Sequence, residues 1–386
     1  MEKVNNLIKG LYIHIPFCDH ICAYCDFKKM IAKDDLKVAY VNALINEIEY
    51  RKDLLGNVQT IYIGGGTPSS LTFDLLTLIF NKLKEYIDLS KILEFTMEAN
   101  PKDINDDNIN DWVNLFKTYH INRLSLGVQS FNNKKLKTLG RNHQKIDAIN
   151  TIRLLHQNNF ENVNCDLIFG IHGDNYHLIK KDVKTCVKNN IKHISLYSLI
   201  LDEHTLFFNM YKEGKTIELD SDNEAKIYYK ITKYLKRHNI YPYEISNFSY
   251  PNYESKHNLL TWDNEHYLGL GVSASSYVEG VRFTNIKSVK TYIKKIEEND
   301  YKSLTEEENT LNLDDMIYEH LILGLRKIKG INLNDFKNRF SVDLIDYYPN
   351  INKLIKDDVL EIKDGNLAIK CDKIYLENAV IEKITN

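Results

Sequence analysis

Two hydrophobic patterns alternate along the first half of the chain. Short β-branched runs predict strands, buried on both faces where the runs are continuous, and longer amphipathic segments predict helices. The expected strands are Leu11–Ile15, Thr60–Ile63, Glu94–Glu98, Arg123–Gly127, Asn164–Ile168 and His193–Leu199. The expected helices between them are Leu36–Tyr50, Leu71–Tyr86, Asn105–Tyr119, Gln144–Asn158 and Tyr176–Asn189. This order predicts an α/β fold with a parallel sheet, built as a partial (β/α)6 version of the eight-fold TIM-like barrel.

The pattern changes in the second half of the chain. Helices are expected at Asn223–His238 and Ser288–Glu298, on either side of a Tyr-, Asn- and Ser-rich stretch, Tyr241–Tyr277, that we expect to be irregular. Past the acidic segment Thr305–Asn309 we expect two helices, a hairpin and a last helix, at Leu311–Leu325, Leu333–Phe340, Val359–Ile369 and Ile374–Ile384. Helices followed by a hairpin predict a small α+β domain of winged-helix type. We therefore expect a barrel domain with its extension over residues 1–300 and a small C-terminal domain over residues 301–386.

Composition and charge exclude several classes of protein. The chain has 386 residues, 43% of them hydrophobic, which is enough for one large and one small domain. Its 50 Lys and Arg against 53 Asp and Glu give a net charge of −3, which argues against a nucleic-acid partner held by charge. No apolar run approaches the ~20 residues of a membrane-spanning helix, and residues 1–10 lack the apolar core of a signal peptide. We therefore expect a cytoplasmic protein with reduced thiols.

Three of the six cysteines lie within eight residues of one another, directly after the first expected strand. Cys18, Cys22 and Cys25 have the spacing Cys-x3-Cys-x2-Cys. Three thiolates on one short loop can hold three irons of a 4Fe–4S cluster and leave the fourth iron open to another ligand. The alternative is a zinc site completed by His14 or His20, although zinc knuckles usually add a second, distant cysteine pair, which this chain lacks. The remaining cysteines are expected to be small buried apolar residues: Cys165, Cys186 and Cys371.

Polar groups follow the ends of several expected strands. A Gly64-Gly65-Gly66-Thr67-Pro68 turn follows the second strand, and glycines there let the backbone approach a ligand closely. The ends of the following strands add two carboxylates, an amide and a guanidinium, at Glu98, Gln129, Arg141 and Asp166. Because the carboxyl ends of parallel strands meet at one rim, these groups are expected to lie together there. Such a set suits ribose hydroxyls and a carboxylate.

The cysteine motif, with Tyr24 before the last cysteine, resembles the signature of the radical S-adenosylmethionine (radical SAM) superfamily. In that superfamily the open iron binds the amino and carboxylate groups of S-adenosylmethionine, which is cleaved to a 5′-deoxyadenosyl radical. Together with phrases such as Glu98-Ala99-Asn100-Pro101, the chain resembles the anaerobic coproporphyrinogen III oxidase family over nearly its whole length. The resemblance implies cluster ligands at Cys18, Cys22 and Cys25. It also implies S-adenosylmethionine contacts at Tyr12, Gly65, Gly66, Thr67, Glu98, Gln129, Arg141 and Asp166.

Three features point to one branch of that family, HemW, whose members are regarded as heme chaperones. Phe27 stands where the decarboxylating enzymes have a fourth cysteine, and the first strand begins at Leu11, without their longer N-terminal segment. The segments Tyr243-Glu244-Ile245-Ser246-Asn247-Phe248 and His257-Asn258-Leu259-Leu260-Thr261-Trp262 resemble HemW motifs, the second being associated with heme. Thr261 replaces a tyrosine of that motif. The resemblance implies that His257 is a heme ligand. The alternative is that His257 is a structural histidine, hydrogen-bonded within the Tyr241–Tyr277 stretch.

Three functions follow from these observations. The first is a heme chaperone that binds heme and transfers it to an acceptor protein, with a reductant protein serving the cluster. The second is an oxygen-independent coproporphyrinogen III oxidase that acts through the deoxyadenosyl radical. The third is an adaptor whose C-terminal domain binds a protein partner while the barrel is vestigial, which the intact cysteine motif and glycine turn argue against.

Overall fold

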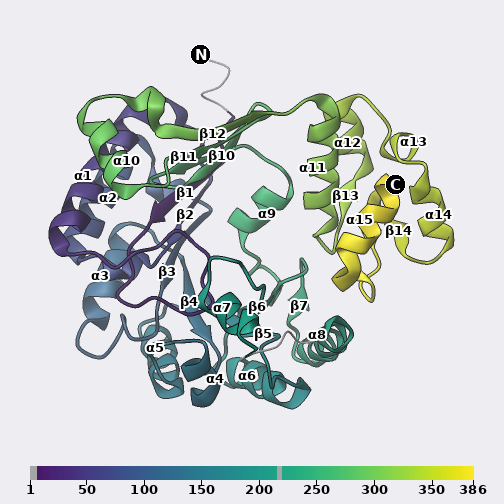
Figure 1. Cartoon of the computed structure of the whole chain (residues 1–386), viewed down its shortest axis with the longest axis horizontal. Coiled ribbons are helices and arrows are strands. Elements are labelled where there is room, and N and C mark those ends of the chain that lie inside the picture. Colours follow the sequence, from purple (N-terminus) through teal and green to yellow (C-terminus); the bar gives the residue numbers. More distant parts are fainter. Residues whose placement is uncertain (1–6, 215–219) are drawn as a thin grey trace.

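A single twelve-stranded sheet forms the centre of the molecule (Figure 1). The computed structural model describes residues 7–214 and 220–386, so residues 1–6, which contribute to the signal-peptide prediction, lie outside the described part. Six adjacent parallel strands occupy the middle of the sheet: β1 (Gly10–Ile15), β2 (Thr60–Gly65), β3 (Glu94–Ala99), β4 (Arg123–Gln129), β5 (Val163–Phe169) and β6 (His193–Ser198). Each end lies within two residues of its expected position, and the parallel sheet of the predicted α/β fold is confirmed.

Helices connect these strands and line the outer side of the curved sheet (Figure 1). They are α1 (Asp34–Arg51), α2 (Phe73–Tyr86), α3 (Ile109–Thr118), α4 (Asn133–Thr138), α5 (Lys145–Gln157) and α6 (Tyr176–Lys188). The side chains of β1 alternate between two environments. Leu11, Ile13 and Ile15 are fully buried in the core, whereas Tyr12 and His14 alternate with them and line a pocket on the opposite face.

The sheet continues past β1 on one side and past β6 on the other. β9 (Tyr267–Leu270) pairs in parallel with β1 and is followed by antiparallel β10 (Ser275–Val278), β11 (Val281–Asn285) and β12 (Thr305–Thr310). β8 (Asn247–Ser249) pairs with β6, and β7 (Tyr241–Pro242) with β8. Remaining helices are α7 (Leu206–Lys212), α8 (Ser221–Lys236), α9 (Lys256–Trp262) and α10 (Val289–Glu297). Within the described residues the sheet ends at β12 and β7, as in an open barrel.

The stretch Tyr241–Tyr277 is not irregular, so that expectation was wrong. It holds β7, β8, α9, β9 and most of β10. These elements have two to seven residues each, which is too short for a clear hydrophobic period.

The acidic segment after α10 also differs from its expected role as a boundary. It forms β12, whose side chains are mostly exposed at the edge of the sheet. Charged side chains on an edge strand hinder pairing with another chain, which explains a strand without an apolar pattern. The division of the chain at residues 300 and 301 stays a prediction, and the pairing of β12 with β11 favours a boundary after Thr310.

The C-terminal part contains the expected helices and hairpin. Its elements are α11 (Leu313–Leu325), β13 (Ile331–Asn332), α12 (Leu333–Phe340), α13 (Leu344–Tyr347), α14 (Asn350–Lys356), β14 (Leu360–Lys363), β15 (Asn366–Ile369) and α15 (Glu377–Thr385). β13, β15 and β14 form a separate three-stranded sheet. α11 begins with a reciprocal cap, in which Asn312 Oδ1 accepts from the Asp315 amide (2.9 Å) and Asp315 Oδ2 accepts from the Asn312 amide (3.2 Å). No helix among the described residues has the length and apolar character needed to cross a bilayer.

Candidate functional site

The three clustered cysteines lie on the segment between β1 and α1, residues 16–33, which we call the cluster loop. Backbone hydrogen bonds close the loop at its base, from Cys18 N to Met30 O (3.0 Å) and from Met30 N to Pro16 O (2.7 Å). A further bond from Ala23 N to Leu139 O (3.2 Å) holds its middle against the end of α4. Cys18 is buried, and Cys22 and Cys25 are half-buried.

The glycine turn and Arg141 contact the thiols directly. Cys18 Sγ lies 3.5 Å from the Thr67 hydroxyl, and Arg141 Nη1 donates to Cys22 Sγ (3.3 Å). A Cβ at Gly66 would lie 3.0 Å from Cys18 Sγ and 2.7 Å from the Phe17 carbonyl oxygen. Only glycine therefore lets the turn pack this closely against the cluster loop. Burial raises the pKa of the Cys18 thiol to about 11, against the opposing hydrogen bond of Thr67. Metal binding at this thiol therefore requires release of a proton.

The donor set suits a cluster better than a single zinc ion. No group of three or more Cys, His, Asp or Glu side chains in the described residues converges closely enough to hold one metal ion. A 4Fe–4S cluster does not require the thiolates to converge on one ion, because each thiolate binds a different iron. His20 Nε2 is engaged with the Gly140 carbonyl (2.6 Å) and His14 Nε2 with the Lys28 carbonyl (2.9 Å), so both candidate zinc histidines already have partners.

Glu98 lies at the carboxyl end of β3, against the glycine turn. Its Oε2 accepts from the Gly65 amide (3.2 Å) and its Oε1 from the Tyr62 hydroxyl (2.7 Å). Burial raises the pKa of the Glu98 carboxyl to about 7; the Tyr62 hydrogen bond opposes this, and the Asp166 carboxylate adds to it. Asp166, on β5, accepts from the Ser125 hydroxyl (2.9 Å) and the Asn164 amide (2.8 Å). The two predicted carboxylates therefore share one electrostatic environment.

Asn100 joins the remaining members of the predicted set, and our interpretation of the sequence missed it. Its Nδ2 donates to Thr67 Oγ1 (3.2 Å), and its Oδ1 accepts from Arg141 Nη2 (2.6 Å). A Cβ at Gly127 would lie 3.3 Å from Gln129 Nε2 and 3.4 Å from Arg141 Nη2, which brings Gln129 to the same place. The available signal was the position of Asn100, two residues after Glu98 at the end of the same strand.

Tyr12 is linked to the cluster loop through His14, which the sequence had suggested only as a zinc ligand. The Tyr12 hydroxyl lies 3.0 Å from His14 Nδ1, and His14 Nε2 lies 2.9 Å from the Lys28 carbonyl. Because a carbonyl can only accept, His14 carries its proton on Nε2 and accepts from Tyr12 at Nδ1. A Cβ at Gly65, whose φ is +115°, would lie 2.6 Å from the His14 ring. His14 thus connects Tyr12, the glycine turn and the cluster loop.

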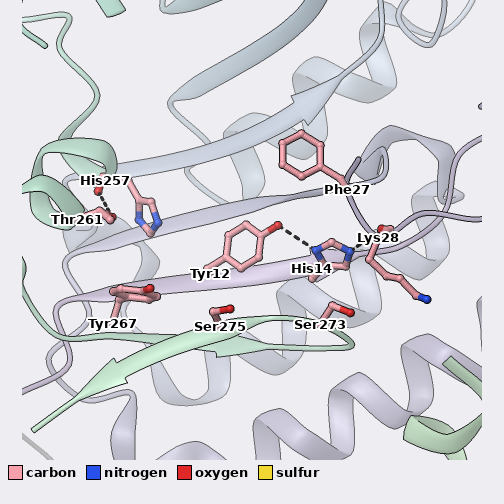
Figure 2. A pocket seen from close by; sticks show the side chains of 9 residues that line it. All are labelled: Tyr12, His14, Phe27, Lys28, His257, Thr261, Tyr267, Ser273 and Ser275. Carbon is pink, nitrogen blue, oxygen red and sulfur yellow. Dashed lines mark hydrogen bonds between the residues drawn. The ribbon is translucent and has the colours of Figure 1, made fainter. Parts of the chain in front are cut away.

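His257 lies in a pocket of about 310 Å³ that extends along Tyr12 of β1 to the cluster loop (Figure 2). His257, Thr261 and Tyr267 are at one end of the view, and His14, Phe27, Lys28 and Ser273 are at the other. Phe27, which replaces the fourth cysteine of the decarboxylases, is 66% exposed at its end of the pocket. Thr261, the other departure from a family motif, donates to the His257 carbonyl within α9 (3.2 Å).

The His257 ring has one hydrogen-bond partner and a ring neighbour on the sheet. Its Nδ1 lies 2.9 Å from the Thr60 hydroxyl at the start of β2, and its ring centroid lies 5.4 Å from that of Tyr62. Burial lowers the pKa of His257 to about 4; Glu94 opposes this and Arg123 adds to it. The imidazole is therefore neutral at pH 7, the form that ligates metals.

The structure separates the predicted residues into two groups. The cysteines, the glycine turn, Glu98, Gln129 and Arg141 lie at or beyond the carboxyl ends of the strands. Asp166 does not, because it is in the middle of β5 (Val163–Phe169) and is hydrogen-bonded there to Ser125 and Asn164, so its expected place at the rim was wrong. His257 instead lies over the amino ends, and the aromatic pairs Tyr12–Tyr62 (6.2 Å) and Tyr62–His257 (5.4 Å) connect it to the first group. Of the three scattered cysteines, Cys165 and Cys186 are buried as expected, but Cys371 is half-buried and accepts a hydrogen bond from Lys236 (3.1 Å).

Comparisons with known proteins agree with this geometry. Residues 12–186 match the Radical SAM superfamily, and residues 311–372 match the HemN C-terminal domain. The Heme chaperone HemW of Lactococcus lactis subsp. lactis is 37% identical over 373 residues, which are 96% of each chain. The proteins of the same name from Bacillus subtilis and Escherichia coli are 36% and 32% identical, over 90% and 70% of each chain respectively.

A solved structure gives the same fold. Coproporphyrinogen III oxidase (HemN) from Escherichia coli superposes with a TM-score of 0.82, covering 98% of this chain and 90% of that one at 20% identity. This confirms the expected radical SAM fold with its C-terminal domain, and the superfamily match implies a 4Fe–4S cluster and S-adenosylmethionine. The extent and identity of the match to the HemW proteins establish that the chain belongs to the HemW family of radical SAM proteins.

Proposed function

We propose that the chain is a cytoplasmic heme chaperone, which binds heme in the pocket that contains His257 and transfers it to an acceptor protein. The observation that carries this proposal is the position of a buried, neutral histidine in a pocket that is also lined by the cluster loop. The relatives named Heme chaperone HemW support it from outside the structure. With the Nδ1 proton donated to Thr60, Nε2 would present its lone pair to the heme iron.

We propose that Cys18, Cys22 and Cys25 hold the 4Fe–4S cluster and that the predicted rim residues bind S-adenosylmethionine. The contacts that support this are those of Thr67 and Arg141 with the thiols, and those of Glu98 with the glycine turn. Bound together, the cluster and S-adenosylmethionine supply one-electron chemistry, for which a reductant protein would provide the electron. The residues of this chain would orient both groups and separate them from water.

Heme titration of the cluster-loaded protein tests the proposal, with and without S-adenosylmethionine. We expect roughly stoichiometric binding that weakens at least about tenfold in His257→Ala, because a coordinate bond is lost. His266→Ala is a matched control, since His266 is a half-buried histidine outside the pocket. Equal affinity of the wild type and His257→Ala would remove His257 from the proposal.

The same preparation tests the second function predicted from the sequence, an oxygen-independent coproporphyrinogen III oxidase. Anaerobic incubation with reductant, S-adenosylmethionine and coproporphyrinogen III should yield no protoporphyrinogen if the chain is a chaperone. Sustained formation of protoporphyrinogen would favour the oxidase instead. Cys18→Ala should lose iron in either case, whereas Cys371→Ala should retain it.

A further inference from the structure

We propose that Lys28 and Ser273 form a subsite for the propionate carboxylates of the tetrapyrrole, at the end of the pocket opposite His257. This inference rests on the proposed heme binding, and it adds the group that orients the ligand. Heme is a flat apolar macrocycle with two carboxylates on one edge. A pocket that orients it needs aromatic walls for the ring and, at one end, a cation and hydrogen-bond donors for the carboxylates.

Lys28 lies where two cavities meet. It lines the pocket of about 310 Å³ and also a second cavity of about 500 Å³ that reaches the start of α10. The backbone of Lys28 is held by the bond from His14 Nε2 to its carbonyl (2.9 Å). Lys287, the other lysine of the second cavity, is already paired with Glu307 (2.5 Å). Lys28 is exposed, and in the described part of the chain no carboxylate pairs with it.

Ser273 supplies a hydrogen-bonding group without a partner at the same end of the pocket. Its Oγ is buried and has no hydrogen-bond partner among the described residues. Its backbone is left-handed, with φ of +56°, and its amide donates to the Ile286 carbonyl (3.0 Å). A buried hydroxyl without a partner is unfavourable unless a ligand or water satisfies it. A carboxylate that accepts from Ser273 and pairs with Lys28 would satisfy both.

The turn that contains Ser273 is built rigidly. The fully buried carboxylate of Glu47 accepts from the Gly271 amide (2.7 Å) and from Asn285 Nδ2 (2.8 Å), which fixes both sides of the turn. Tyr292 adds a third bond to this carboxylate (2.6 Å). The backbone around Ser273 is thus held in place before any ligand arrives, which lowers the ordering cost of binding.

The aromatic residues of the pocket suit the macrocycle. Tyr12 lines its middle, Tyr267 lines the end near His257, and Phe27 lines the end near Lys28 (Figure 2). The volume of about 310 Å³ is at the lower end of the range of small-molecule pockets, ~300–1,000 Å³. Part of the ring would therefore stay outside the pocket, within reach of a second protein.

The test compares heme with its dimethyl ester, which lacks the two negative charges, in the same detergent solution. We expect the full-length wild-type protein to bind heme roughly tenfold more tightly than the ester, ~1.4 kcal/mol. Lys28→Gln should abolish most of this preference by weakening heme alone, and Lys28→Glu should reverse it. Ser273→Ala should reduce the preference in the same way but to a smaller extent. Lys287→Gln, a lysine of the neighbouring cavity that already has a partner, should keep the wild-type ratio.

The outcomes separate this inference from the function on which it rests. A preference that is unchanged in Lys28→Gln, or an equal loss of both ligands, would overturn the Lys28–Ser273 subsite while leaving heme binding intact. Failure of the wild type to bind either ligand would overturn the proposed function itself. Because Lys28 is exposed, its substitution should not affect folding, which the thermal transition of each variant verifies.

Discussion

At the scale of single residues, the site depends on histidines that burial keeps neutral. His14 and His257 each have a pKa lowered to about 4, chiefly by burial. His14 uses both ring nitrogens for hydrogen bonds, whereas within the described part of the chain the His257 ring makes one, to Thr60. This difference distinguishes a residue that connects structural elements from one that remains able to bind a ligand.

The low pKa of His257 gives a pH prediction. A group whose folded-state pKa is about 4 keeps its lone pair throughout the range above that value. The heme affinity that depends on His257, taken as the difference between the wild type and His257→Ala, should therefore stay constant from pH 8 to pH 5.5. An ordinary histidine, with a pKa of about 6.5, would be mostly protonated at pH 5.5 and would lose about tenfold. A fall of that size centred near pH 6.5 would contradict the buried, neutral state.

At the scale of elements, the carboxyl ends of the strands determine where the chemistry occurs. The six parallel strands were predictable because short runs rich in apolar residues recur between helical patterns, although polar residues such as Thr96 and Ser125 interrupt them. β12 was not, because an exposed edge strand of Thr and Glu has no apolar period, and α9 was not, because it has only seven residues. In the site, the cysteine spacing and strand-end polar residues could be identified, and Asn100 was missed although it follows Glu98 at the same strand end. Its two roles became visible only in the fold, because its partners lie 33 and 41 positions away in sequence.

The glycine turn allows a test at this scale. In Gly66→Ala the new Cβ would lie 2.7 Å from the Phe17 carbonyl and 3.0 Å from Cys18 Sγ, so the cluster loop must shift. We expect the iron and sulfide content after anaerobic reconstitution to fall at least about twofold, while the fold is retained. The matched control is Gly56→Ala, where no atom lies within 4 Å of the new Cβ. Equal iron content in both variants would show that the loop tolerates the methyl group.

At the scale of the whole molecule, Arg326 is one of several charged residues that join the C-terminal part to the barrel. Arg326 lies 3.9 Å from Glu244 Oε2 and 3.5 Å from Glu377 Oε2, and its guanidinium lies 4.6 Å from the Trp262 ring centroid. Both carboxylates are buried, and burial raises the pKa of Glu377 to about 7, with Arg326 opposing. One cation is therefore shared between two buried acids from different parts of the chain.

Arg326→Met should destabilise the protein by ~3–5 kcal/mol at pH 8, because two buried carboxylates lose their cation. A carboxyl with a raised folded-state pKa adds stability at low pH, and that stability is lost as the pH rises through about 7. The difference in unfolding free energy between the wild type and Arg326→Met, measured by urea unfolding, should therefore be smaller at pH 6 than at pH 8. Lys370→Met, which removes a surface pair with Asp358, is the control and should change little at either pH. A deficit that does not depend on pH would show that the carboxylates are ionised throughout.

The cluster loop contributes to two places at once, because residues 18–25 supply the thiols and Phe27 and Lys28 line the neighbouring pocket. Because the two places share a segment, binding at one can change the affinity at the other, and such coupling is thermodynamically reciprocal. If loading of iron and sulfide changes the affinity of the chain for the macrocycle by some factor, binding of the macrocycle must change the affinity for iron and sulfide by the same factor. In a cell short of iron, incomplete loading of the cluster would then change the affinity of this chain for the macrocycle, without any additional iron sensor.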